Sequence, residues 1–326
     1  MKERYLSHPT KPIELFEGIN CSELLERLES CSFQGRQLAL AAKVWTNALD
    51  EDLTVWMGLA GAMVPAGMRK VIVQLMENRL VDVIVSTGAN LYHDFFETVG
   101  YYHYLGSDMV DDRELREERI DRIYDTFADE DVFFAVDREI REWAMKTIED
   151  RPYTTREFLR LLGEEAGRRS KGEKGILSTA AELDIPVYCP AIGDSSIGIA
   201  LAEADRRLIF DMVGDVEETA RMAAEKETMV IYVGGGTPKN FIQQTEVTNI
   251  VNNRKVSGHK YAVQFVVDPP HWGGLSGCTF EEAISWGKIA TDAKMVTVLS
   301  DATIALPIVS AAVLTRRKGR KRPGKD

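Results

Sequence analysis

The segment from Gly273 to Lys288, GGLSGCTFEEAISWGK, combines a helix start with a tryptophan and a lysine two residues apart. Thr279 and Glu282 form a T-x-x-E capping box, which predicts that a helix begins after Thr279. If that helix continues to residue 291, Lys288 lies at the edge of an apolar face. A lysine there is expected either to extend its ammonium group to solvent or to act as an amine nucleophile toward an imine or carbonyl.

Glu282 and Trp286 lie one helical turn apart on the opposite face of the same predicted helix. An indole beside a carboxylate can bind an organic cation. The alternative roles are helix capping for Glu282 and core packing for Trp286. Because both faces of this helix carry apolar residues, we expect a surface beyond its own sheet to cover it.

Loops rich in Gly, Ser, Thr and Asp follow the predicted strands, where open α/β sheets bind ligands. In GGGTPK, Thr237 is an N-cap candidate and Pro238 suits the first helical position, which predicts an anion site at a helix N-terminus. Asp194 and Asp301 suit ribose hydroxyls, but each equally suits helix capping. Neither GxGxxG nor a P-loop occurs. The candidates for nucleotide binding are Thr87, Gly88, Ala89, Asp194, Gly234, Gly235, Ser276, Asp301 and Ala302.

Motifs for metal or acyl-transfer chemistry are weak. His93 and Glu97 are four residues apart, but HDFFE is not HExxH and no third ligand accompanies it, so no metal site is predicted. The four cysteines lack CxxC spacing and are expected to be buried free thiols. GxSxG is absent from the sequence.

Six short apolar strands alternate with helices along the chain, and this pattern predicts a parallel sheet covered on both faces. We therefore expect an α/β, Rossmann-like, doubly wound fold. The charged segment 111–184, which includes RELREERIDRIYDTF, predicts a helical elaboration within one domain of residues 1–315. The predicted strands are 54–58, 81–85, 186–190, 229–233, 261–267 and 295–299.

Charge is unevenly distributed along the chain. The formal net charge is −11, although the tail 316–326, RRKGRKRPGKD, holds seven basic residues and one acidic residue. The remaining chain is strongly acidic, which argues against nucleic acid as a main partner and suits cationic ligands. We expect the tail to be disordered. No apolar run approaches the roughly 18 residues of a membrane span, and no signal-peptide core is present, so we expect a cytoplasmic protein without membrane contact.

Several motifs closely resemble the deoxyhypusine synthase family. GLAGAMVPAGMR, VDVIVSTGAN, RIYD, IPVYCPAIGDSSIG, GGGTPK and SWGK occur in that family's order and spacing. The resemblance implies one Rossmann-like domain that assembles as a homotetramer, with active sites at a dimer interface. It also implies NAD-dependent oxidation and cleavage of spermidine, and a 4-aminobutyl imine on Lys288. The family then transfers this group to an acceptor amine and reduces the product imine with the same NADH.

The sequence departs from the family at positions that recognise and deprotonate the polyamine. Tyr92 and His93 replace a pair of glutamates, and Asn240 replaces the histidine after G-G-G-x-x-K. Ile199 replaces the acidic residue that closes D-G-S-L-G-D, and WGGL at 272–275 replaces D-G-S-D. The NAD loops are largely retained, so the resemblance implies conserved cofactor and lysine chemistry with an altered amine pocket.

We expect an NAD-dependent transferase that passes an aminobutyl-type group through Lys288 to a small free amine, as homospermidine-type and agmatine-joining members do. The predicted amine-site residues are Glu282, Trp286, Asn240 and His93. One alternative is a deoxyhypusine synthase that modifies a lysine of a translation initiation factor. Others are an NAD-dependent amine dehydrogenase, a sirtuin-like deacylase (whose paired catalytic histidine and zinc cysteines are missing) and a nucleotide-binding protein without turnover. Retention of Lys288, Glu282 and Trp286 together argues against loss of activity.

Overall fold

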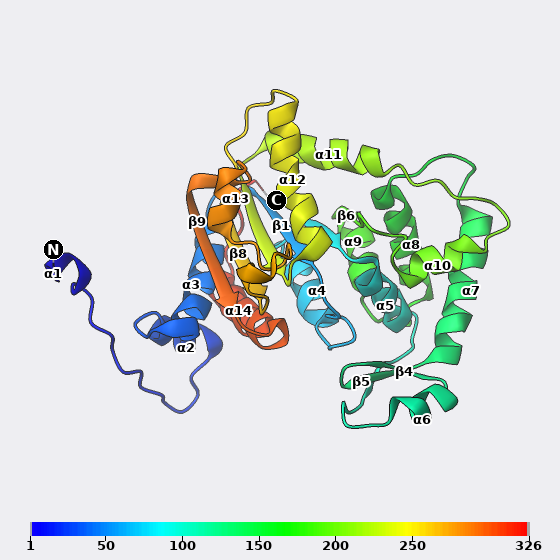
Figure 1. Ribbon diagram of the computed structural model, residues 1–326, viewed down its shortest axis with the longest axis horizontal. Helices are drawn as coiled ribbons and strands as arrows, with labels where there is room; N and C mark the ends of the chain where they lie inside the picture. The colour runs from blue at the N-terminus through cyan, green and yellow to red at the C-terminus, as the bar shows by residue number, and fades with distance from the viewer. Residues whose placement is uncertain (1, 325–326) are drawn as a thin grey trace.

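The computed structural model describes residues 2–324, and a six-stranded parallel sheet lies at its centre (Figure 1). The strands are β1 (Thr54–Leu59), β2 (Val83–Ser86), β6 (Val187–Tyr188), β7 (Thr228–Val233), β8 (His259–Val266) and β9 (Ile289–Leu299). Their order is β6-β2-β1-β7-β8-β9, and every neighbouring pair is parallel. The chain builds outward from β1 in one direction and later from β7 in the other, so the strand order reverses between these two strands. Ligands of doubly wound sheets bind at this switch point.

Alternating side chains of the strands fill two cores, one on each face of the sheet. Val55, Met57 and Leu59 of β1 enter one core, whereas Trp56 enters the other, as the period of two requires. The first face is covered by α2 (Cys21–Leu28), α3 (Phe33–Ala48), α4 (Arg69–Glu77) and α14 (Ala302–Arg317). The second is covered by α11 (Met212–Glu225), α12 (Gly236–Val251) and α13 (Phe280–Ser285). The predicted α/β fold with helices on both faces is confirmed.

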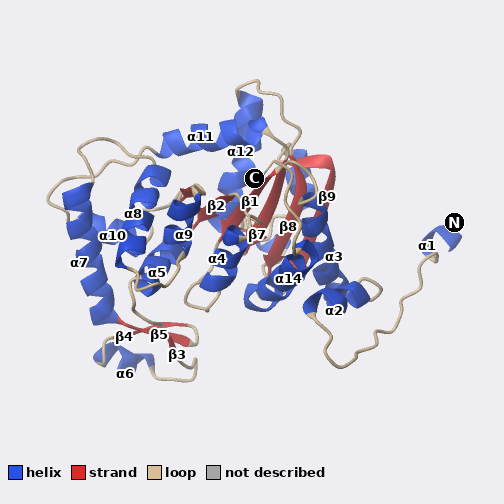
Figure 2. Ribbon diagram, turned by 180° about the vertical axis from the view of Figure 1, so that it is seen from behind, coloured by secondary structure: helices blue, strands red, loops and turns tan. Residues whose placement is uncertain are grey.

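Further helices extend the molecule beyond the β2–β6 side of the sheet (Figure 2). They are α5 (Gly88–Thr98), α6 (Asp112–Glu117), α7 (Glu130–Thr147), α8 (Thr155–Arg169), α9 (Ile176–Leu183) and α10 (Ser196–Ala202). Residues 120–129 differ from the predicted helix. They form a hairpin of β4 (Ile120–Ile123) and β5 (Thr126–Asp129), and β5 also pairs with β3 (Tyr104–Leu105) in an antiparallel sheet. Arg119 and Tyr124 have φ of 58° and 54°, which ends α6 and turns the hairpin at residues that are neither Gly nor Asn.

The N-terminal end of the chain stands apart from the sheet (Figure 1). Here α1 (Lys2–Tyr5) is followed by an extended segment, and the side chains of Tyr5 and Leu6 are largely exposed. Within residues 2–324, no helix combines the length and hydropathy needed to cross a lipid bilayer. The four cysteines are free thiols, but only Cys189 is fully buried.

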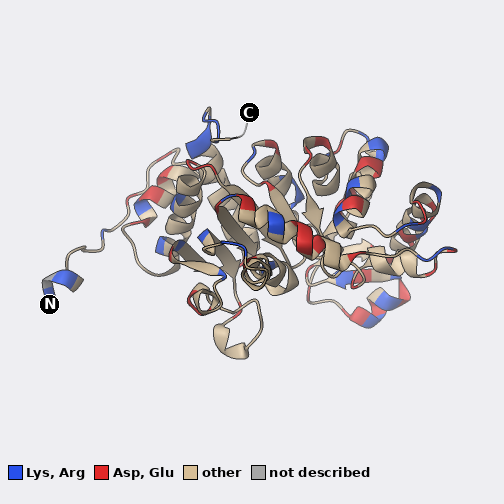
Figure 3. Ribbon diagram, turned by 90° about the horizontal axis from the view of Figure 1, so that it is seen from above, with Lys and Arg blue, Asp and Glu red and all other residues tan. Residues whose placement is uncertain are grey.

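The basic C-terminal segment lies at the rim of the molecule (Figure 3), and its side chains contact the body, in contrast with the disordered tail expected from its composition. Arg317 forms an ion pair with Asp50. The Arg322 guanidinium is 2% exposed, donates to the Asp82 carboxylate at 3.0 and 2.9 Å and donates to the Leu53 carbonyl at 2.9 Å. This interaction joins the tail to the segments that enter β1 and β2. Residues 325 and 326 lie outside the described residues.

We predict that Arg322→Ala lowers the free energy of unfolding by about 3 kcal/mol, because a buried carboxylate loses the positive charge that compensates it. Urea denaturation measures this change. Lys321→Ala removes a neighbouring exposed cation and should change stability by less than about 0.5 kcal/mol. Equal stability of the two variants would show that the tail does not pack as the structure describes.

Candidate active site

The loops at the carboxyl ends of β1 and β7 meet at the switch point of the sheet. Gly234 follows β7 with φ of 71°, and a Cβ added there would lie 3.4 Å from the Cβ of Ala60, the residue after β1. Glycine therefore serves two purposes at this position: it adopts the left-handed conformation and permits close packing of the two loops.

The Gly234–Gly236 loop is fastened to the segment around Ser276. A Cβ on Gly235 would lie only 2.4 Å from the Cα of Ser276, and the Gly236 amide donates to the Ser276 hydroxyl at 3.0 Å. The Gln264 amide nitrogen donates to the carbonyls of Gly234 and Ser276 at 2.9 and 2.8 Å. Helix α12 begins at Gly236, two residues before the predicted start, so Thr237 is not its N-cap. The N-terminus of α12 still points toward the switch point, as an anion site requires.

On the other side of the switch point, the loops after β2 and β6 touch. A Cβ on Gly88 would lie 2.4 Å from the Ser195 hydroxyl oxygen, so these loops approach more closely than any larger residue at position 88 would allow. Asp194 and Ala89 are exposed beside this contact. Six of the predicted nucleotide-binding residues (Thr87, Gly88, Ala89, Asp194, Gly234 and Gly235) thus follow strands within the β6–β7 part of the sheet.

A buried asparagine that the sequence analysis overlooked joins two of these loops. The Asn90 side chain is fully buried; its amide nitrogen donates to the Gly61 carbonyl at 2.6 Å and to the Thr87 hydroxyl at 3.1 Å. Its oxygen accepts from the Val64 amide at 3.2 Å. Thr87 is the N-cap residue of α5. Asn90 therefore holds the loop after β1 against the start of α5.

Asp301 and Ala302 lie at the same edge of the sheet but farther along it. Asp301 caps α14 by accepting from the amide and hydroxyl of Thr303 at 2.7 and 2.8 Å, which was one of its two expected roles. It follows β9, three strands away from β1 and therefore about 14 Å along the edge. Within one chain, Asp301 lies outside the crevice at the switch point.

The predicted position of Lys288 on a helix is wrong. Helix α13 ends at Ser285, and Gly287 has φ of 69°. The Lys288 amide donates to the Ala283 carbonyl at 3.1 Å and the Gly287 amide donates to the Ile284 carbonyl at 2.9 Å, which together form a Schellman motif. Lys288 therefore lies in the turn before β9. The glycine in SWGK was the sequence signal for this helix end.

The backbone of Lys288 is fixed, while its side chain is half-buried. Its carbonyl accepts from the His259 amide at 3.0 Å, and its ammonium nitrogen lies 5.3 Å from the centre of the Trp286 ring. The Trp286 side chain is 63% exposed. The indole thus contacts a cation of this chain, and its outer surface remains open for a second one.

Only half of the expected capping box forms at the start of α13. The Thr279 hydroxyl accepts from the Glu282 amide at 3.1 Å, but among the described residues the Glu282 carboxylate makes no return bond to the Thr279 amide. It lies near Cys278 instead. Burial raises the pKa of the Cys278 thiol, the Lys239 ammonium opposes this shift, and Glu282 reinforces it. The Glu282 carboxylate thus faces the Cys278 thiol, not the N-terminal backbone of its own helix.

Lys239 is a second lysine near this site, and the sequence analysis gave it no role. Its side chain is 1% exposed; its nitrogen donates to the Gln264 amide oxygen at 2.9 Å and to the Cys278 carbonyl at 2.5 Å. Burial lowers its pKa to about 8, and the charge of Lys288 adds to the decrease, whereas Cys278 and Glu282 oppose it. The ammonium of Lys239 thereby connects α12, β8 and the segment before α13.

The predicted amine-site residues lie on three different elements. Glu282 and Trp286 accompany Lys288, Asn240 lies on α12 directly after Lys239, and His93 lies on α5. Lys288 precedes the amino end of β9, where Ile289 pairs with His259; Leu299 pairs with Val266 at the carboxyl end. Seven residue steps of β8 separate these pairs, or about 23 Å. Lys288 and Asp301 therefore lie at opposite ends of one strand.

A cavity of about 440 Å³ lies beside the segment that precedes α13. Gln264 and Val266 of β8, Thr297 of β9, and Asp268 and Cys278 contribute to its walls. It is large enough for a small organic molecule. Because Gln264 and Cys278 also contact Lys239, the cavity adjoins the polar network around that lysine.

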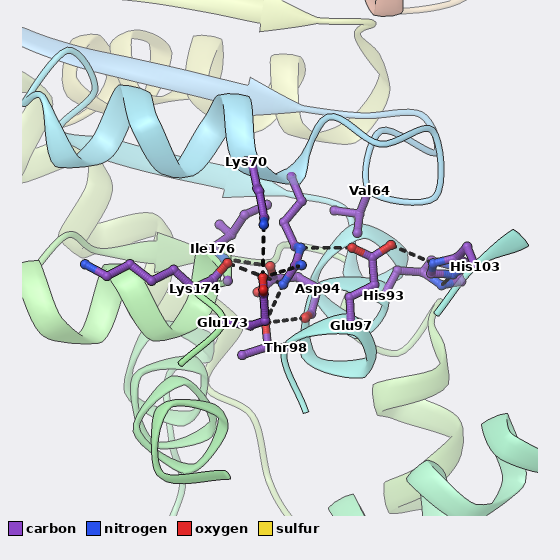
Figure 4. A network of polar contacts seen from close by, with 12 residues as sticks. Val64, Lys70, His93, Asp94, Glu97, Thr98, His103, Glu173, Lys174 and Ile176 are labelled. Atoms are coloured by element: carbon purple, nitrogen blue, oxygen red, sulfur yellow. Dashed lines mark hydrogen bonds and ion pairs between the residues drawn. The ribbon is translucent and has the colours of Figure 1, made fainter. Parts of the chain in front are cut away.

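His93 belongs to a chain of polar contacts that starts at α4 (Figure 4). Arg69 Nε lies 2.9 Å from Glu97 Oε2, Glu97 Oε1 lies 2.7 Å from His103 Nδ1, and His103 Nε2 lies 2.9 Å from His93 Nδ1. Burial lowers the pKa of His93 to about 3, and repulsion from His103 contributes. His103 follows α5 in an irregular segment, so no periodic spacing in the sequence indicated its contact with His93.

The chain is similar to proteins of one family over most of its length. The family model described as "Deoxyhypusine synthase" matches residues 23–313. A protein of Methanosarcina acetivorans described as "Probable deoxyhypusine synthase 2" is 48% identical over 323 residues, which cover 98% of this chain and 93% of that protein. A protein of Archaeoglobus fulgidus with the same description is 50% identical over 289 residues, covering 88% and 95% of the two chains.

The fold agrees with this similarity. A crystal structure described as "a putative deoxyhypusine synthase from Entamoeba histolytica" superposes with a TM-score of 0.63, covers 96% of this chain and 98% of that chain, and is 17% identical. At that identity the superposition supports the fold alone. The match of the family model and the identity to the archaeal proteins show that this chain belongs to the deoxyhypusine synthase family.

We predict that Gly235→Ala lowers the free energy of unfolding by about 1–3 kcal/mol, because the new methyl group would collide with the Ser276 backbone. Chemical denaturation gives the value. Gly274→Ala is the matched control, since a Cβ at Gly274 meets no atom within 4 Å. If the two variants are equally stable, the close contact between the glycine loop and Ser276 does not exist in solution.

Proposed function

We propose that this family member is an NAD-dependent transferase that carries an aminobutyl-type group as an imine on Lys288 and passes it to a small free amine. The observation that carries the proposal is the setting of Lys288. Its backbone is fixed by a Schellman motif and β8, and its ammonium lies beside the open face of Trp286. Tyr92, His93 and Asn240 differ from the family's usual residues, which supports an altered choice of amine.

The residues at the switch point fit a dinucleotide. Gly88 and Gly235 let their loops pack closely against the neighbouring loops. The Cβ positions of Gly193 and Gly236 face open space, where a ligand can approach the backbone. The N-termini of α5 and α12 supply amides for phosphate groups. NAD, when bound, would supply the hydride acceptor for amine oxidation. We propose that the residues that hold it are Thr87, Gly88, Ala89, Asp194, Gly234, Gly235 and Ser276, with Asp301 and Ala302.

Lys288 would act through its neutral amine. Its nitrogen attacks the imine carbon of the oxidised donor, the new Nζ–C bond forms, and the donor nitrogen leaves as an amine after proton transfer. The acceptor amine then attacks the Lys288 imine, and the lysine amine is released unchanged. Trp286 and Glu282 are suited to bind the cationic end of the transferred group, the first by its π face and the second by its charge.

Assembly would complete the site. Trp286 is 63% exposed, and Ile250 and Val251, at the end of α12 near Gly287, are 48% and 73% exposed. This apolar surface lies around the proposed catalytic lysine and calls for cover. Since Lys288 and Asp301 occupy opposite ends of β9, a second copy is needed if both contribute to one site. We therefore propose a homotetramer with active sites at a dimer interface.

The substrate is identified by incubating the protein with NAD and spermidine, putrescine or agmatine, alone and in pairs, followed by mass spectrometry. A conjugate of two small amines supports the proposal. Modification of a lysine on an added translation initiation factor, with no small conjugate, would assign the chain to deoxyhypusine synthesis. NAD reduction without a conjugate would indicate a dehydrogenase.

We predict that borohydride, added with NAD and the donor amine, attaches the donor fragment to Lys288. Lys288→Arg should abolish the adduct and lower transfer at least about 1000-fold, because a guanidinium stays protonated and cannot form the imine. Lys294→Arg, a change of an exposed lysine on the following strand β9, is the matched control. Peptide mass spectrometry locates the adduct. Normal transfer by Lys288→Arg would mean that the group passes directly between free amines.

We predict that Asp301→Ala weakens NAD binding about tenfold by removing a partner of the ribose hydroxyls. Calorimetry measures the change in affinity.

Mixing Asp301→Ala with Lys288→Arg subunits tests whether two subunits share one site. If each site takes Lys288 from one subunit and Asp301 from its partner, reassembled mixtures assayed at NAD concentrations well below the Kd of Asp301→Ala should reach about a quarter of wild-type activity. A mixture no more active than the mean of its two components at that NAD concentration, despite exchange of subunits, would place both residues in sites of a single chain.

A further inference from the structure

In the contact chain Arg69–Glu97–His103–His93, the donor and acceptor atoms of each hydrogen bond follow from the Glu97 carboxylate, which only accepts. The 2.7 Å contact therefore requires that His103 donates from Nδ1 to Glu97. In the uncharged pair, His103 Nε2 then carries the lone pair. It must accept from His93 Nδ1 across 2.9 Å, which leaves the lone pair of His93 on Nε2.

Burial and packing hold this arrangement in place. The side chains of Arg69, Glu97 and His103 are 10%, 17% and 4% exposed, so water competes little for their contacts. Phe133 of α7 packs against both imidazole rings, with ring centres 5.6 and 6.3 Å away. Asp137 of α7 faces the Tyr92 hydroxyl. His103 is therefore the ionisable group that acts on the pKa of His93.

The position of His93 suits a role in the proposed site. Helix α5 starts at Gly88 in the nucleotide loops, and Asp94 accepts from the first amides of α9, those of Ile176 and Leu177, at 2.6 and 2.8 Å. Arg69 is the first residue of α4. The starts of these helices lie at the carboxyl edge of a parallel sheet, where ligands bind. His93 is partly exposed, and its Nε2 is not among the buried atoms without a partner.

The other histidines are less suited to this role. His8 lies in the exposed N-terminal segment and His271 in the exposed 3-10 turn Pro270–Trp272. His259 is fully buried at the amino end of β8, where its Nδ1 contacts the Thr228 hydroxyl at 2.7 Å. Within residues 2–324, the His93–His103 pair is the one in which an imidazole contacts a second imidazole that in turn contacts a carboxylate.

We infer that His93 is the base that removes a proton from the donor ammonium, and that His103, Glu97 and Arg69 are positioning residues that keep the His93 Nε2 lone pair available. The inference rests on the proposed amine oxidation. The donor N–H bond breaks and a His93 Nε2–H bond forms while, in the same step, the Nδ1 proton of His93 moves to His103 Nε2, so that His93 stays neutral and the resulting His103 imidazolium is compensated by Glu97. A protonated alkylamine needs this step, because its pKa near 10.4 leaves only about one molecule in 2500 neutral at pH 7.

The kinetic test is His93→Gln, which keeps a polar side chain without a titratable nitrogen. We expect kcat/KM for the donor to fall at least about 100-fold at pH 7, with NAD affinity unchanged. Between pH 7 and 9 the rate of the variant should rise about tenfold per pH unit, as the donor itself loses its proton, whereas wild type should vary less. His8→Gln is the control. A wild-type rate and pH profile in His93→Gln would overturn the inference.

The structural test needs no turnover. With only five histidines in the chain, long-range ¹⁵N–¹H spectra of labelled protein can identify the tautomer of each ring. We expect His93 protonated on Nδ1 in wild type and in Glu173→Gln, which removes another carboxylate near Arg69 (3.5 Å) that does not contact His103. Glu97→Gln should give mixed tautomers and a lower rate at pH 7 that recovers as pH rises. A His93 protonated on Nε2 in wild type contradicts the inference even if no substrate is found, and an inactive wild type with the expected tautomer contradicts only the proposed function.

Discussion

The buried ammonium of Lys239 is the interaction on which the site region depends. A lysine that is 1% exposed is costly unless oxygen atoms replace its water, and here the Gln264 side chain and the Cys278 carbonyl do so. Each partner belongs to a different part of the fold: Lys239 to α12, Gln264 to β8, and Cys278 to the segment that leads into α13. Since the Gln264 amide also donates to the carbonyls of Gly234 and Ser276, the same network fixes the position of the glycine loop relative to β8. The glycine loop after β7 and the segment before α13 are thus held by one polar cluster.

The sheet could be predicted from sequence because its signal is local. Each strand is a short run of β-branched and aromatic residues, and the loops after the strands carry glycine where backbones touch, as at Gly88 and Gly235. The hairpin at residues 120–129 gave no such signal, because Tyr124 occupies a turn position where Gly or Asn is usual. The packed tail was missed for a different reason. The sequence shows that Arg322 is charged, but it does not show that the guanidinium lies against the buried carboxylate of Asp82.

The site was predictable in parts. Lys288 and Trp286 do lie together, but through a turn and not along a helix face, because Gly287 adopts a left-handed conformation that ends α13. Asn90 and His103 have roles that depend on contacts between segments distant from the recognisable motifs. In the sequence, His93 stood out for its spacing from Glu97 and as a departure from the family, and neither indicated its contact with His103. Its structure explains how a neutral ring could take a position usually held by a carboxylate: Glu97 sits two contacts away and supplies negative charge through His103.

If Lys288 carries the transferred group, as proposed, its fixed backbone limits how far that group can travel. With its amide bonded to Ala283 and its carbonyl to His259, the residue cannot move as a hinged loop, so only its side-chain torsions are free. A group held in this way can move only as far as the lysine side chain reaches, unlike groups on the long flexible arms of enzymes that carry intermediates between distant sites. On that proposal, donor and acceptor occupy the same space in turn, and an acceptor with an unbranched approach to its amine fits a short carrier better than one embedded in a folded surface.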